Sequence, residues 1–98
     1  MEFVEFIWDL PNDPRGNIQH IAEHGVTAEE AEEVVREGYV AAEASRSSGL
    51  PTAVGWTSTG KRLAVIFEVA DPSQPTVYVL TAYETTPLAP RKRRRKKR

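Results

Sequence analysis

The chain has 98 residues, the size of a single domain, and a formal net charge of −1. It contains no cysteine, which excludes a disulfide framework and a cysteine-ligated zinc site. No apolar run reaches the roughly 18 residues that a membrane span requires, and the acidic first residues lack the basic start of a signal peptide. The composition therefore predicts a cytoplasmic protein without a membrane-spanning segment.

The first predicted element is a strand over Phe3–Trp8, where aromatic and β-branched residues follow one another. Asp9–Gly16 is rich in proline, glycine, aspartate and asparagine, which predicts a loop. A short helix over Ile18–His24 follows, with the Asn17 side chain as its N-cap. Gly25 ends that helix, because glycine enters the left-handed conformation at low cost. His24 is thus expected in the last helical turn, directly before a chain reversal.

A second helix is predicted over Ala28–Glu37, where alanines and valines form one narrow apolar face. Thr27 and Glu30 have the spacing of a capping box, in which each side chain accepts a hydrogen bond from the other residue's backbone. Gly38 ends the helix.

The second half of the chain has the pattern of β-structure. Tyr39–Ala42 fits either a short strand or an extended link, and strands are predicted over Thr52–Thr57, Arg62–Val69 and Thr76–Tyr83. Short turns between the three strands make neighbours in sequence pair as an antiparallel meander. Together with the N-terminal strand and the two helices, this order predicts an α+β fold.

Two tyrosines of the last predicted strand matter for the search for a site. Strict alternation along a strand places Tyr78 and Tyr83 on opposite faces of the sheet. On this basis only one of them is expected to share a surface with His24.

Several motifs, taken in their order and spacing, resemble the BrnT family of bacterial type II toxins. The resemblance covers about residues 6–84, and the motifs that carry it are Ile7-Trp8-Asp9, Asn17, His24-Gly25-Val26 with Glu29-Glu30-Ala31, Gly55, Gly60-Lys61-Arg62-Leu63 and Val79-Leu80-Thr81-Ala82. The resemblance implies a RelE-like fold and a ribonuclease activity that arrests translation. It also implies an antitoxin partner that binds DNA through a ribbon-helix-helix or helix-turn-helix domain.

The chain departs from the family pattern at several basic positions. Tyr78, Tyr83 and Glu84 stand where the last strand of the family is basic, and Glu23 stands where a lysine precedes the His-Gly turn. An arginine before the Gly55 position is also missing. Metal-independent RNA cleavage needs cations for the phosphate besides an acid and a base. The sequence thus leaves open an active ribonuclease, a catalytically silent binding module of the same fold, and a plain interaction domain.

For an active ribonuclease, the candidate catalytic residues are four. His24 would act as acid or base, Arg46 and Arg62 would contact phosphate, and Tyr83 would be an auxiliary donor. The alternative for His24 is a purely structural role, in which it bonds a backbone carbonyl at the helix end.

His20 and His24 stand four residues apart, on one face of the predicted helix. No cysteine or carboxylate at a defined spacing completes a metal site around them, so we expect no metal and no cofactor. The expected partners are the antitoxin and RNA as substrate, with no membrane, and a homodimer is left open.

The charge of the chain is unevenly distributed. The last eight residues are all lysine or arginine, which leaves five of the 13 basic residues against 14 acidic ones in residues 1–90. We expect a domain over residues 1–86 and a disordered basic tail over residues 87–98, set apart by prolines. The tail is either a solubilising end, a contact to the acidic helix or the antitoxin, or a nucleic-acid-binding arm that acts with Lys61 and comprises Arg91, Lys92, Arg93, Arg94, Arg95, Lys96, Lys97 and Arg98.

Overall fold

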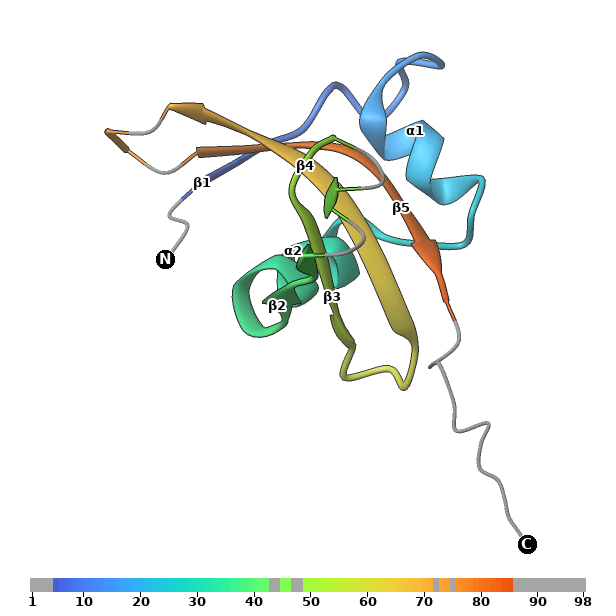
Figure 1. The fold of residues 1–98 in the computed structure, drawn as a ribbon. Coiled ribbons are helices and arrows are strands. Elements are labelled where there is room, and N and C mark those ends of the chain that lie inside the picture. The colour runs from blue at the N-terminus through green and yellow to red at the C-terminus, as the bar shows by residue number, and fades with distance from the viewer. Residues whose placement is uncertain (1–4, 43–44, 47–48, 72, 75, 86–98) are drawn as a thin grey trace, which may run out of the picture.

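The computed structural model describes residues 5–42, 45–46, 49–71, 73–74 and 76–85 (Figure 1). In chain order the elements are β1 (Glu5–Ile7), α1 (Asn17–Ala22), α2 (Ala28–Glu37), β2 (Tyr39–Val40), β3 (Thr52–Trp56), β4 (Arg62–Asp71) and β5 (Thr76–Glu84). The predictions for the start of the first strand, for the domain boundary at residue 86 and for the basic tail fall outside the described residues.

Within the described residues, five strands form one mixed sheet in the order β1-β5-β4-β3-β2. β3, β4 and β5 are consecutive antiparallel neighbours, which confirms the predicted meander and the α+β class. β1 pairs with β5 in parallel, and β2 pairs with β3 at the opposite edge. The predicted order counted four strands and left Tyr39–Ala42 open; the fifth strand of the described sheet is β2, which is the short-strand alternative.

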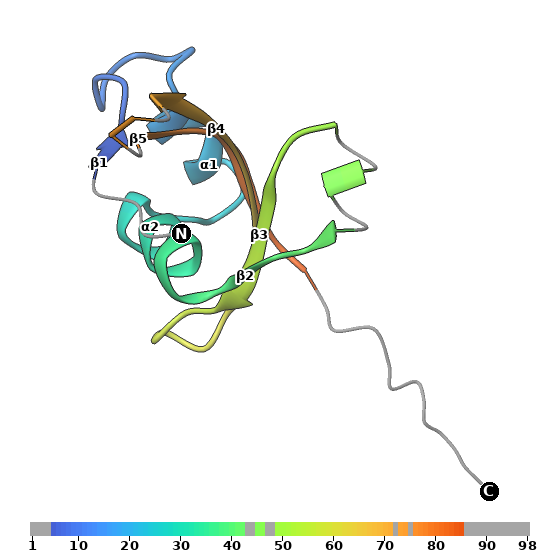
Figure 2. The same ribbon diagram turned by 60° about the vertical axis from the view of Figure 1, so that its left-hand side comes forward.

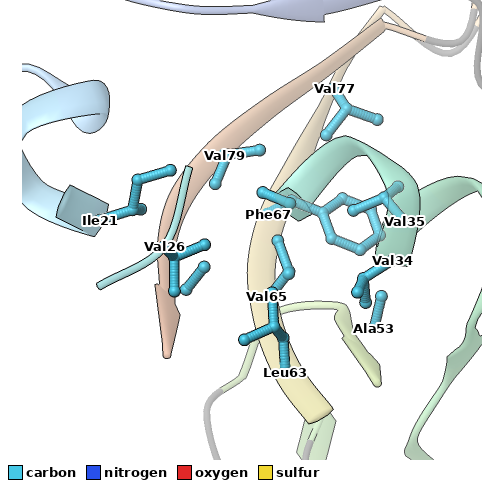
Figure 3. Close-up of a cluster of buried hydrophobic side chains, with 12 residues drawn as sticks. Ile21, Val26, Val34, Val35, Ala53, Leu63, Val65, Phe67, Val77 and Val79 are labelled. Carbon is cyan, nitrogen blue, oxygen red and sulfur yellow. The ribbon is translucent and has the colours of Figure 1, made fainter. Parts of the chain in front are cut away.

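Both helices lie on the same side of the sheet, which curves around them (Figure 2). α2 packs against β3 and β4, and α1 packs against β5. We call the sheet surface that meets the helices the inner face, and the opposite surface the outer face. One apolar core fills the inner face, with Phe67 near its middle (Figure 3), and it comprises Ile21, Val26, Ala31, Val34, Val35, Ala53, Leu63, Val65, Phe67, Val77, Val79 and Ala82.

Helix α2 begins and ends as its sequence predicts. The Thr27 hydroxyl accepts the Glu30 backbone N–H, and the Glu30 carboxylate accepts the Thr27 N–H, so the capping box is formed. At the other end, a Cβ on Gly38 would clash with the Val54 carbonyl oxygen. Gly38 therefore lets the chain leave α2 directly against β3, an approach that any side chain would block.

Helix α1 differs from the prediction at both ends. Gly16 is the N-cap residue and Asn17 is the first helical residue, so a capping role for the Asn17 side chain is wrong. That side chain is buried and bonded elsewhere, as described below. The helix ends at Ala22, and His24 lies in the turn that follows. Gly25 has a φ of 77°, which confirms the predicted left-handed reversal.

An irregularity in β5 overturns the predicted orientation of its tyrosines. Phe67 pairs with Val79 and Ile66 pairs with Thr81, so Leu80 is an extra residue in β5. Such a bulge reverses the alternation of the residues beyond it. Val77 and Val79 face the core before the bulge, whereas Ala82 faces it afterwards. Tyr83 and Tyr78 consequently project from the same face of the sheet, the outer face. The prediction that they lie on opposite faces is wrong.

None of the helices that the structure describes is long and apolar enough to cross a membrane.

Candidate functional site

Two histidines and one tyrosine meet at the end of β5. β1 covers only residues 76–78 of β5, and further along the strand α1 is the neighbouring element. The His24 ring lies 6.5 Å from the Tyr83 ring and 5.3 Å from the His20 ring, measured between centroids, in edge-to-face geometry. The structure thus brings together two of the predicted catalytic residues, His24 and Tyr83, and adds His20. We call these three residues the histidine cluster.

The histidine cluster is open to solvent. His20 and His24 are both exposed, and 39% of the Tyr83 surface is accessible. Imidazole can take up or release a proton near neutral pH, and a phenol can donate a hydrogen bond. Two imidazoles side by side can therefore serve as base and acid for one substrate. The spacing of four residues predicted that His20 and His24 share a face, and the two rings do lie close together, although the helix ends before His24.

The turn that carries His24 is held from the β3–β4 hairpin. The Lys61 ammonium donates to the Gly25 carbonyl over 2.6 Å and lies 3.3 Å from a Glu30 carboxylate oxygen. Within the turn, the His24 and Gly25 N–H groups donate to Ile21 and Ala22 carbonyls. Lys61 thus fixes the backbone next to His24. The ammonium of Lys61 has these two partners within the chain. Its predicted role in nucleic-acid binding stays a prediction.

Glu30 is the centre of this support. Only 7% of its surface is exposed, and burial acts to raise its pKa. Hydrogen bonds from the Thr59 hydroxyl and the Thr27 N–H, together with the bond and the charge of Lys61, act in the opposite direction and prevail. The pKa of Glu30 is therefore lower than usual, and its carboxylate is charged at neutral pH.

Arg62 opens β4 near the histidine cluster. Its carbonyl accepts the Thr85 N–H, and Tyr83 pairs with Ala64, the next β4 residue on the same face. Arg62 is therefore a diagonal neighbour of Tyr83 on the outer face. The strand pattern predicted a cation at this end of β4, and the register places it beside the cluster.

Trp56 is a surface residue that the sequence analysis missed. It is directly opposite Arg62 in the β3–β4 pair, and 61% of its surface is exposed. Ala53 of the same strand faces the core, so alternation places Trp56 on the outer face. This alternation was readable from the sequence, but a tryptophan in an apolar strand is ordinarily interpreted as core.

Arg46 lies by the other end of β3. Its neighbour Ser45 accepts the Thr52 N–H through its hydroxyl, and Arg46 lines a shallow hollow with Val40, Gly49, Leu50 and Pro51. Among the described residues, no hydrogen bond or ion pair joins Arg46 to the histidine cluster. The structure therefore does not assemble the full set of four predicted catalytic residues.

A larger hollow of about 430 Å³ lies between the end of α2 and strands β2, β3 and β4. Its lining is mostly apolar, with Val35, Val40, Phe67 and Val69 among its residues. None of the residues of the histidine cluster borders this hollow.

The residues of the Trp-Asp motif have structural partners. The Trp8 indole donates to Glu32 of α2 over 2.7 Å. The Asp9 carboxylate accepts hydrogen bonds from the Asn17 N–H and from the Tyr78 hydroxyl. The bond from Tyr78 to Asp9, then burial and the nearby carboxylates, raise the pKa of Tyr78. These residues join loop, helix and strand.

No group of three or more histidine, aspartate or glutamate side chains with metal-binding geometry is found among the described residues.

Comparisons of the chain with protein-family models, with curated proteins and with solved structures return no match.

Proposed function

We propose that the chain is a BrnT-like toxin that cleaves RNA without a metal ion and is neutralised by a DNA-binding antitoxin. The proposal rests on the order of the sequence motifs and on one structural observation, the histidine cluster at the end of β5 with Arg62 beside it. It agrees with the α+β architecture expected for such a toxin.

In the proposed reaction, one imidazole of the cluster removes the proton from a ribose 2′-hydroxyl. The resulting alkoxide attacks the adjacent phosphorus, and the bond from phosphorus to the 5′-oxygen breaks. The second imidazole protonates that leaving oxygen, so protons and electron pairs balance. Arg62 lies where a guanidinium can neutralise the developing phosphate charge, and Tyr83 can donate to the same group.

A silent binding module is the second candidate, and specific contacts favour it. Lys61 is engaged by Gly25 and Glu30, and Tyr78, at a position that is basic in the family, is engaged by Asp9. A module of this kind would keep the fold and would contact nucleic acid through its basic tail, or a protein partner, but would not cleave RNA.

Expression of the chain in bacteria, with and without the His24→Ala substitution, tests the proposed function. We expect growth arrest with the unaltered chain and relief of the arrest by His24→Ala, at equal amounts of soluble protein. Arrest that persists unchanged in His24→Ala would remove His24 from the mechanism. Absence of arrest with the unaltered, soluble chain would favour the binding module.

A further inference from the structure

The outer face carries a row of aromatic and basic side chains that leads to the histidine cluster. Trp56 on β3 lies opposite Arg62 on β4, and Tyr83 on β5 follows diagonally, next to His24. Neighbouring strands are about 4.8 Å apart, so Trp56 and Tyr83 stand on strands separated by roughly 10 Å. The row thus runs from an aromatic platform across a cation to the acid–base groups.

The exposure of Trp56 is the observation that calls for an explanation. Burial of a tryptophan side chain stabilises a fold. The other tryptophan of the chain, Trp8, follows this rule, because it packs against the core and donates a hydrogen bond to Glu32. Trp56 instead leaves 61% of its surface in solvent on the same face as Arg62. An indole beside a guanidinium can stack on a base while the guanidinium holds the adjoining phosphate.

We propose that Trp56 is the base-stacking platform of the proposed ribonuclease site and that it restricts the substrate to single-stranded RNA. This inference rests on the proposed function. In a duplex the bases are stacked on one another, and their faces cannot reach an indole that projects from a sheet. A single strand can turn one base onto Trp56 and place a neighbouring phosphate at Arg62, toward His24 and Tyr83.

Stacking on Trp56 would contribute to binding and leave the chemical step to the histidine cluster. Loss of one stacked base weakens single-strand binding by about fivefold to 150-fold. Trp56→Ala should therefore raise KM by a factor in this range and change kcat by no more than about twofold. Trp56→Tyr, which keeps an aromatic face, should restore most of the affinity.

Fluorescence gives a direct test that does not depend on cleavage. In the full-length His24→Ala, Trp8→Phe variant, Trp56 is the only tryptophan. This variant is titrated with short oligouridylate and oligoadenylate while the fluorescence of Trp56 is recorded. We expect saturable quenching by both single strands. RNA duplexes of the same length and polyphosphate, which has charge but no bases, should quench little over the same range. The His24→Ala, Trp8→Phe, Trp56→Tyr variant tests the affinity by polarisation of a labelled oligouridylate, and it should bind nearly as its His24→Ala, Trp8→Phe parent does.

The outcomes separate the two proposals. Equal quenching by duplex and single strand, or none by either, would overturn the stacking role. An unchanged KM in Trp56→Ala would overturn it as well, even if cleavage through His24 is established. Selective quenching in a chain that never cleaves RNA would instead contradict the proposed ribonuclease and keep Trp56 as a single-strand contact.

Discussion

Two polar clusters lie between α1 and β5, and they are built in opposite ways. In the first, Asn17, Asp9 and Tyr78 share hydrogen bonds at the point where β1 meets β5. In the second, His20, His24 and Tyr83 touch only through ring edges and face solvent. A cluster whose polar atoms are satisfied internally holds the fold, whereas one whose atoms face outward can act on a substrate.

The contrast is sharpest for Asn17, whose surface is 4% exposed. Its side-chain carbonyl accepts the Asp9 N–H, and its amide donates to the Ile7 and Val79 carbonyls. One side chain thus ties the loop to both strands of the parallel pair. Buried polar groups that lose their partner carry the full cost of desolvation.

We expect Asn17→Ala to show the largest effect on the free energy of unfolding. Three backbone groups lose a partner, which should cost about 3 kcal/mol, since each unsatisfied buried group costs roughly 1–3 kcal/mol. Asn12→Ala, in the exposed part of the same loop, is the matched control and should lie within about 0.5 kcal/mol of the unaltered chain. Urea denaturation of both variants measures the difference. Equal midpoints would show that the Asn17 bonds do not hold the strand pair.

Glu30→Gln should have the next largest effect, and it depends on pH. The pKa of Glu30 is lower in the folded chain than in the unfolded chain, where it is near 4.5. The charged carboxylate therefore stabilises the fold above pH 4.5, and this stabilisation is lost as the pH falls through the folded pKa. At pH 7 the variant should be less stable by about 1–2 kcal/mol, because the bonds to Thr59 and Lys61 are weakened. The gap should begin to narrow near pH 4.5 and should close as the pH falls through the folded pKa of Glu30. Thermal unfolding of both proteins from pH 7 to pH 3 measures the difference in their stability. A difference that is constant over this range would contradict the charged state of Glu30.

The two tyrosines offer a matched pair with the smallest expected change in stability. Tyr78→Phe removes a 2.8 Å hydrogen bond to Asp9 and should cost about 1 kcal/mol, whereas Tyr83→Phe should cost almost nothing. Because the pKa of Tyr78 is raised in the folded chain, the contribution of Tyr78 to stability is complete below pH 10. This contribution is lost as the pH rises through the folded pKa. Chemical denaturation at neutral pH compares the two variants. A larger loss of stability in Tyr83→Phe than in Tyr78→Phe would contradict the account, in which the cluster of Tyr78 holds the fold and the histidine cluster does not.

Much of the fold was readable from local signals. The capping box of Thr27 and Glu30, the reversal at Gly25 and the three strands of the meander each depend on a few consecutive residues. The parallel pairing of β1 with β5 depends instead on residues about 70 positions apart, and nothing in either strand alone specifies it.

The candidate site was only partly predictable for the same reason. The reversal at Gly25 placed His24 next to a turn, but the extra residue Leu80 decides that Tyr83 reaches the outer face. A bulge has no strong sequence signal in a run of β-formers, so strict alternation gave the wrong face. The bonds of Asn17 to Ile7 and Val79 likewise arise only once helix and strands have packed, and the local pattern of a cap concealed them.

We propose that the exposed histidine cluster performs acid–base chemistry on RNA and does not hold the fold. The most direct measurement is cleavage of single-stranded RNA by the purified full-length chain in the presence of a chelator, compared with His24→Ala at matched folded fraction. We predict cleavage by the unaltered chain, a rate lower by about 100-fold or more in His24→Ala, and an unfolding free energy changed by less than about 0.5 kcal/mol. Equal cleavage rates for the two proteins, or a loss of rate that only follows a loss of folded protein, would contradict it.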